Sequence, residues 1–217
     1  MNNVFTREVC TLSLGYFKER LRVLLVLGAC TILVHSVGFV IVLKILEGYK
    51  SGVLPLVFLL GFAIILQLGL IKVVLNITGN KPVTLKDAFK NYNMSLRYLV
   101  GCIAYAAIVL IGLCLFIVPG IVWAVRYSMW PFLLVHRDLE IFEAFKESSK
   151  ITHGSKKDLF TLFITLFGGV VLSLVPLGLG LVFLYPYASL VLAQSYRKMQ
   201  LLRTNEVLYT NLALRVQ

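Results

Sequence analysis

Long apolar runs, separated by short segments that hold most of the charge, dominate this sequence of 217 residues. A helix rises about 1.5 Å per residue, so about 20 apolar residues cross the hydrocarbon core of a bilayer. Six runs come near this length: residues 23–43, 53–71, 98–118, 121–135, 159–175 and 177–193. The sequence therefore predicts an all-α integral membrane protein whose six transmembrane helices form three hairpins.

The amino-acid composition supports this class. Apolar residues make up 59% of the chain and charged residues only 14%, whereas a soluble domain carries about 25% charged residues. Helices buried in a soluble core are the alternative for the shorter runs, but none of these runs has a polar face. We interpret residues 1–217 as a single polytopic membrane domain. The charged residues, whose net charge is +11, gather between the apolar runs. Basic residues in these positions fit contact with anionic lipid headgroups better than binding of nucleic acid.

The basic residues indicate the orientation of the spans, because lysine and arginine resist translocation and accumulate on the cytoplasmic side. With a cytoplasmic N-terminus, 18 of the 21 basic residues fall in cytoplasmic segments. Lys44 and Lys50 lie on the external side, and Arg126 lies within the fourth run. We therefore expect both termini to be cytoplasmic. If the fourth run did not cross the membrane, the next basic segment would lie on the external side, so the distribution of basic residues also supports six spans.

Two basic segments, residues 82–92 and 139–152, have the pattern of amphipathic helices. Both contain an acidic residue followed by Ala-Phe-Lys, and Gly154 is expected to end the second. Basic amphipathic helices lie in the membrane interface with their apolar face toward the acyl chains. We expect the phenylalanines to enter the inner leaflet and the lysines to face headgroups or water. The candidate interfacial residues are Phe89, Lys90, Phe145 and Lys146.

The shared pattern suggests an internal repeat of an interfacial helix followed by an apolar hairpin. The predicted repeats are residues 5–75, 82–135 and 139–196. A proline lies in or near each hairpin turn, at Pro55, Pro119 and Pro176, and the third run is expected to turn at Pro119-Gly120. Convergence is the alternative, because any cytoplasmic amphipathic helix favours small, aromatic and basic residues.

One stretch, residues 117–159, carries a resemblance to a known family. Its matching elements are Val-Pro-Gly-Ile at 118–121, Arg-Tyr-Ser at 126–128, Pro-Phe-Leu-Leu-Val at 131–135, Glu-Ala-Phe-Lys at 143–146, Ser148, and Thr-His-Gly at 152–154. This order resembles the membrane-domain family attached to some bacterial glycerophosphodiester phosphodiesterases, and its stand-alone YciC-like relatives. The core match covers about a fifth of the chain, and the remaining hairpins agree in pattern only.

The resemblance implies a bacterial inner-membrane location and a lipid-linked context. It implies no activity, because the stand-alone members have none that is agreed and the spans leave no room for a phosphodiesterase domain. The sequence departs from the family pattern at residues 136–138, His-Arg-Asp, and at Ser149. These departures weaken assignment to any one subfamily.

Arg126 is the one charge clearly inside a predicted span. An arginine at the centre of a membrane helix costs about 2.5–3.5 kcal/mol on insertion scales, so a partner must offset the cost. Tyr185 and Tyr187 lie at a similar depth in the sixth run and could bond the guanidinium. The alternative is a lipid phosphate, which suits the planar fork of arginine. The candidate lipid- or anion-binding residues are therefore Arg126, Tyr185 and Tyr187.

Catalytic and metal-binding patterns are absent from the sequence. The four cysteines and three histidines match no metal-ligand spacing, and no Ser-His-Asp order or phosphate-binding glycine loop occurs. We expect neither an enzyme nor a cofactor. The predicted spans also contain no Asp or Glu, which counts against a proton-coupled transporter.

Two functions remain open. The first is an accessory or scaffold protein that organises membrane lipids, a protein partner or further copies of itself. The alternative is a transporter of small molecules or lipids, built from parallel repeats with a broken helix near Pro131 or Pro186 that lines a cavity. A water-accessible cavity at mid-depth that touches Arg126 would favour transport, and a solid bundle sealed by lipid would favour the scaffold.

Overall fold

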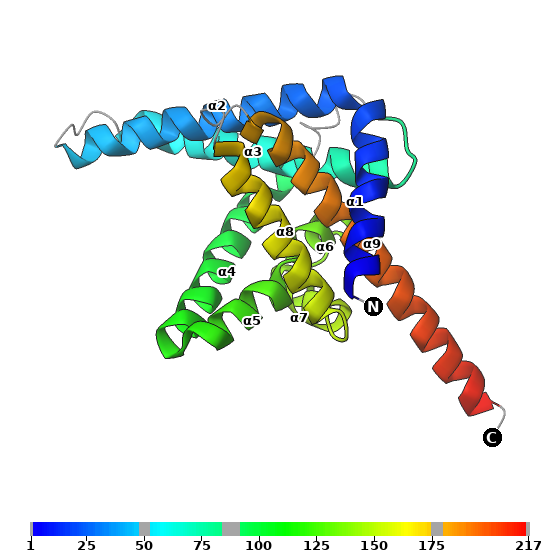
Figure 1. The fold of residues 1–217 in the computed structure, drawn as a ribbon. Helices are drawn as coiled ribbons and strands as arrows, with labels where there is room; N and C mark the ends of the chain where they lie inside the picture. Colours follow the sequence, from blue (N-terminus) through cyan, green and yellow to red (C-terminus); the bar gives the residue numbers. More distant parts are fainter. Residues whose placement is uncertain (1, 48–52, 84–91, 175–179, 216–217) are drawn as a thin grey trace.

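The computed structural model describes residues 2–47, 53–83, 92–174 and 180–215, and over these residues the chain is helical without β-strands (Figure 1). The elements are α1 Asn2–Glu19, α2 Leu21–Leu46, α3 Val53–Thr78, the short 3-10 helix η3 Tyr92–Met94, α4 Ser95–Leu115, α5 Ile117–Tyr127, α6 Trp130–Arg137, α7 Ile141–Ile151, α8 Lys156–Leu174 and α9 Gly180–Arg215. The all-helical prediction is confirmed for this part of the chain.

Within the described residues, four stretches are long and apolar enough to cross a membrane. They are Leu21–Leu46, Leu54–Thr78, Ser95–Leu115 and Ile117–Arg137. The chain is therefore a membrane protein. The predicted fifth and sixth runs fall on α8 and α9, and their crossing of the membrane stays a prediction, as does the division into three repeats.

The helices form a branched arrangement in Figure 1. The α2 and α3 helices run side by side, the α4–α5 hairpin points away from them, and α9 passes the centre and continues beyond it. The core lies where α3, α6 and α9 meet, around side chains such as Val74, Leu133, Leu134, Leu190 and Tyr196. Large apolar side chains on α2, α3 and the α4–α5 hairpin are exposed, as expected for surfaces that face lipid.

The turn between α4 and α5 differs from the prediction. Phe116, with extended backbone angles, separates the two helices, and Pro119 and Gly120 lie inside α5. Proline fits there because it occupies the first helical turn, whose N–H groups lack intrahelical partners. Gly120 allows the two helices to pack closely. A Cβ on Gly112 would lie only 2.8 Å from the Cα of Gly120, so α4 and α5 approach each other at these glycines.

The fourth predicted run is broken, as its proline suggested. The α5 helix ends at Tyr127 and α6 begins at Trp130, with Pro131 in the first turn of α6. The two residues between the helices, Ser128 and Met129, keep helical backbone angles, so a short turn interrupts the run just before the proline. Its position follows from the geometry of proline, which fits the start of a helix but not its interior.

The α9 helix continues beyond the sixth predicted run, which ends at residue 193, and includes Arg197 and Lys198. Arg197 donates hydrogen bonds to the carbonyl of Leu75 at 2.7 Å and to Thr78 Oγ1 at 2.8 Å, at the last turn of α3. Cations near a helix C-terminus satisfy its free carbonyls and its dipole. Lys198 pairs with Glu8 of α1 at 2.5 Å. The basic pair therefore joins three helices.

The second predicted amphipathic helix is confirmed as α7, which spans Ile141–Ile151 and carries Ala144, Phe145 and Ser148 on its buried face. Gly154 follows it with a φ of +92°, a conformation that glycine adopts without strain. Most of the first amphipathic segment, including Phe89 and Lys90, lies outside the described residues.

Candidate functional site

The break between α5 and α6 is held by hydroxyl groups of α7. The carbonyl of Arg126 accepts hydrogen bonds from Ser148 Oγ at 3.1 Å and from Thr152 Oγ1 at 3.0 Å. Ser148 Oγ also accepts a hydrogen bond of 3.3 Å from the N–H of Met129. Backbone groups at helix ends need such partners when they are buried. The serine and threonine therefore fix the end of α5 against α7.

The side chain of Arg126 is partly buried and bonds to α7 through one atom. Its Nε donates to Ser149 Oγ at 2.6 Å, and its Cζ lies 5.8 Å from the ring centroid of Tyr127. Among the described residues, no carboxylate lies within ion-pair distance, and the two terminal nitrogens donate no hydrogen bond. The bidentate end of the guanidinium is thus free to bind a ligand.

The structure does not bring Arg126 together with the two tyrosines. Tyr185 donates a hydrogen bond to Gln67 of α3, and Tyr187 donates one of 3.2 Å to the carbonyl of Cys10 of α1. The predicted pairing between Arg126 and a tyrosine of α9 is therefore not formed. The physical reason is the fold: α9 packs against α1, α2, α3 and α8, whereas Arg126 faces α7.

Arg126 lines an open groove of about 840 Å³ between α4, α5 and α7. Its lining residues are Ala104, Ala107, Ile108, Arg126, Tyr127, Ile141, Phe142, Phe145, Lys146, Ser149 and Lys150. The walls are mainly apolar, and the charges in the lining are all positive. Lys146 has no carboxylate within 4.0 Å in the described part of the chain, while Lys150 Nζ lies 3.4 Å from Glu147.

The two interfacial candidates on α7 occupy different environments. Lys146 is exposed and lines the groove. Phe145, expected to enter the inner leaflet, is only 7% exposed and packs against Trp130 and Tyr127, with ring centroids 5.5 and 5.8 Å away. Phe142 is instead 83% exposed. It is the aromatic residue of α7 that the structure presents to its surroundings.

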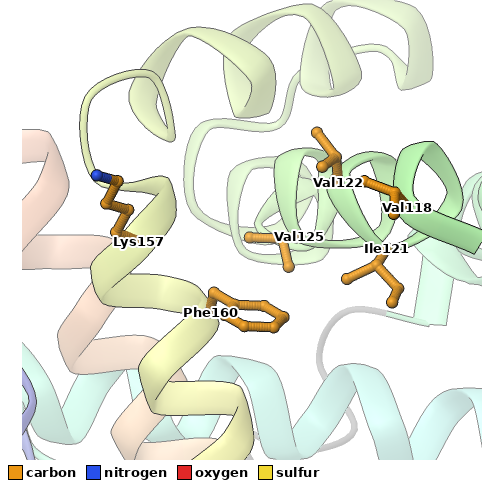
Figure 2. A pocket seen from close by; sticks show the side chains of 6 residues that line it. All are labelled: Val118, Ile121, Val122, Val125, Lys157 and Phe160. Carbon is orange, nitrogen blue, oxygen red and sulfur yellow. The ribbon is translucent and has the colours of Figure 1, made fainter.

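A second, smaller groove of about 340 Å³ lies between α5 and α8. Figure 2 shows its lining: Val118, Ile121, Val122 and Val125 from α5, and Lys157 and Phe160 from α8. Val125 and Arg126 are neighbours in sequence but line different grooves. The α5 helix is therefore the wall that separates the two.

Comparison with protein families decides the relationship of this chain to known proteins. The model of a family described as a protein of unknown function, DUF975, matches residues 8–203. The chain belongs to the DUF975 family. No curated protein and no solved structure matches it. These comparisons agree with an uncharacterised family and give no link to glycerophosphodiester phosphodiesterases, so that part of the resemblance is not supported.

In this DUF975 protein, a cluster of ion pairs joins α7 to α6 and α9. Glu147 is 20% exposed; it pairs with Arg203, with Lys150 at 3.4 Å and with Arg137 at 3.8 Å. Beside it, the Tyr196 hydroxyl lies 3.0 Å from His136 Nδ1. Burial raises the pKa of Tyr196, which lies beyond the predicted sixth span, to about 12. The phenol therefore stays neutral at pH 7 and serves as a hydrogen-bonding group.

Sequence analysis named Ser148 and Thr152 only as parts of the family resemblance and missed their role in supporting the groove. Ser148 and Thr152 lie four residues apart, a spacing that places both on one face of a helix. That spacing was the available signal, but its partner, the carbonyl of Arg126, is a main-chain atom and leaves no trace in the sequence. The smaller groove had no signal, because it exists only where α8 packs near α5.

Proposed function

We propose that this membrane protein binds an anionic phospholipid in the α4–α5–α7 groove and thereby organises lipids in the membrane. The observation that carries the proposal is the pairing of apolar walls with Arg126, Lys146 and Lys150 in one open groove. An amphiphile with a negative headgroup matches this lining, since its acyl chain needs apolar contact and its phosphate needs cations. Binding sites usually combine an apolar lining with a few placed polar groups.

We assign the lipid headgroup to Arg126 because the two terminal nitrogens of its guanidinium group donate no hydrogen bond within the described residues. Ser149 fixes the guanidinium through Nε, and this leaves the terminal nitrogens for two parallel hydrogen bonds to a phosphate. An arginine in a membrane protein without a carboxylate partner is costly. A lipid phosphate would offset that cost in the membrane.

The orientation predicted from the basic residues supports a site at the cytoplasmic leaflet of a bacterial inner membrane. With both termini cytoplasmic, 18 of the 21 basic residues lie on that side, as the positive-inside rule requires. This arrangement uses six spans, including α8 and α9, and places α7 in the cytoplasmic interface. Anionic lipids attract basic residues there by about 1 kcal/mol for each lysine or arginine.

The proposed role is binding without catalysis. Its support is the sequence, in which no catalytic or metal-binding pattern occurs. A lipid held in a groove can position neighbouring lipids, a protein partner or a second copy of the chain. The exposed Phe142, which lines the groove, would anchor α7 in the interface.

Movement of lipid is the second candidate function, and the break between α5 and α6 favours it. Transporters place their sites beside discontinuous helices, and Arg126 lies at the end of α5, next to this break. Reconstitution into liposomes that contain fluorescent lipid separates the two functions. A transporter accelerates exchange of labelled lipid between leaflets, whereas a protein that only binds lipid leaves the exchange rate at that of protein-free liposomes.

The binding proposal is tested by mass spectrometry of lipids that copurify in native-membrane nanodiscs. Arg126→Lys retains the charge but loses the fork, and Arg126→Leu loses both. We expect both variants to fold and to lose retained anionic phospholipid, with the larger loss in Arg126→Leu. Arg7→Leu is the matched control, because Arg7 is exposed on α1 and outside the groove. Unchanged anionic lipid in both Arg126 variants would refute the proposal.

A further inference from the structure

We propose that the groove between α5 and α8 is a separate binding site for a single-chain anionic amphiphile of the fatty-acid class. The chain would lie along α5, and its carboxylate would meet Lys157 (Figure 2). This site differs from the phospholipid groove in size, in charge and in the face of α5 that it uses.

The apolar part of the site is formed by one face of α5 and one ring of α8. Val118, Ile121, Val122 and Val125 follow helical spacing, so they form a continuous stripe. Phe160 lies opposite this stripe in Figure 2. Almost all of the lining surface is apolar, which suits a hydrocarbon chain and offers nothing to a polar headgroup along its length.

The polar end of the site is Lys157, the one charged residue in the lining. Within the described part of the chain, it has no carboxylate within 4.0 Å. It lies in the first turn of α8, and Figure 2 shows it at one end of the lining, with Phe160 nearer to the valines and Ile121. A single cation at one end of an apolar groove complements an amphiphile with one negative charge at one end.

Size and charge favour a fatty acid over a diacyl phospholipid. The volume of about 340 Å³ is near the lower limit of ligand pockets, which span about 300–1,000 Å³. The groove around Arg126 is about 840 Å³ and contains Arg126, Lys146 and Lys150. A fatty acid, with one acyl chain and one negative charge, therefore fits the smaller groove. A phospholipid, with its larger headgroup, fits the larger groove.

Photocrosslinking tests the proposal on the full-length protein in nanodiscs. The probes are a long-chain fatty acid with a photoreactive group on its chain, the alcohol of the same chain length, and phosphatidylglycerol with the same group on one chain. Peptide mapping should place the fatty acid on α5 and α8. Val122→Trp fills the groove and should abolish this labelling, whereas Ile117→Trp, a control at an exposed position of α5 outside the lining, should leave it intact.

Two further variants keep the test decisive. Val118→Trp fills the groove from a residue that is itself exposed, so it serves if Val122→Trp fails to fold. Lys157→Gln should weaken fatty-acid binding about fivefold, as expected for one lysine at an anionic contact, and should leave the alcohol unchanged. Equal labelling by phosphatidylglycerol, labelling that persists in both tryptophan variants, or equal effects of Lys157→Gln on acid and alcohol would each overturn the proposal.

The outcome is independent of the phospholipid site. Arg126→Leu should leave fatty-acid labelling of α5 and α8 unchanged, because Arg126 lines only the other groove. Loss of labelling in that variant with folding preserved would show that the two grooves are one site, and would overturn the proposal.

Discussion

The hydroxyl of Thr152 donates a hydrogen bond of 3.0 Å to the main-chain carbonyl of Arg126. This contact joins the end of α5 to the C-terminal end of α7, because Thr152 directly follows α7 and lies 26 residues after Arg126 in the chain. The interruption leaves backbone N–H and C=O groups without helical partners, and inside a membrane protein no water reaches them. Side chains must therefore form the hydrogen bonds that water would form elsewhere. The α7 helix thus supports the groove and also supplies part of its lining.

The hydroxyl support can be measured through Ser148→Ala and Thr152→Val. Ser148 and Thr152 are fully buried, and loss of a buried hydrogen bond costs about 1–3 kcal/mol when it leaves a group unsatisfied. We expect each variant to lower thermal stability in detergent, and the double variant to lower it further. Ser36→Ala is the control, since Ser36 is exposed and bonds only within α2. Equal stability of Ser148→Ala and Ser36→Ala would contradict the role assigned to Ser148.

The close approach of α4 and α5 depends on two glycines. A Cβ on Gly112 would lie 2.8 Å from Gly120 Cα, a distance that requires the helices to separate. Gly112→Val should therefore destabilise the protein by about 1–3 kcal/mol. Gly61→Val on α3 is the matched control, because nothing lies within 4 Å of a Cβ there. If the two variants melt at the same temperature, the hairpin is not held by this contact.

The all-helical class and the long apolar helices could be predicted from the sequence, because apolar length is a local property. The runs at 23–43 and 53–71 fall within α2 and α3, and the proline break near Pro131 was visible. The α4–α5 turn was misplaced because proline and glycine mark turns more often than they start helices. Only the packing of Gly112 on Gly120 shows why glycine is needed within α5.

The candidate site was predictable in part, for a related reason. Arg126 was identified because its charge is unusual in an apolar run. Its neighbours were not, since residues 23 to 26 positions further along the chain reach it only through the fold. A tyrosine of α9 at a matching depth suggested a partner, but depth along a helix does not give the direction in which a side chain points.

The ion pairs of Glu147 should stabilise the packing of α7 on α9. Glu147→Gln leaves Arg203, Arg137 and Lys150 without this carboxylate. Because the carboxylate is only partly buried, we expect a loss of about 1–3 kcal/mol, between the values for exposed and buried ion pairs. Glu140→Gln is the control, since Glu140 is exposed and pairs with Arg97 at 3.5 Å. A loss of stability no larger than that of the control, measured by thermal melting, would contradict the prediction.

The predicted orientation can be tested by cysteine labelling in intact cells. The four native cysteines, of which Cys30 and Cys114 are exposed, are first replaced by alanine. An impermeant maleimide should label Ser51→Cys, which is predicted to be external, and should not label Ser155→Cys or a cysteine at residue 217. Permeabilised cells supply the control, in which Ser155→Cys reacts. Labelling of Ser155→Cys in intact cells would exclude the six-span arrangement.

The two phenylalanines of α7 should respond differently to a charge. Phe145 packs against Trp130 and Tyr127 in the core, so Phe145→Glu should cost more than about 3 kcal/mol, the least that truncation of a buried phenylalanine usually costs. Phe142 is 83% exposed, so Phe142→Glu should melt like the original protein in detergent. In bilayers, however, Phe142→Glu should raise the accessibility of α7 to a water-soluble quencher, measured with a fluorophore at Lys146→Cys in the background without native cysteines. Quenching equal to that of the original Phe142 sequence would show that this aromatic side chain does not anchor α7 in the interface.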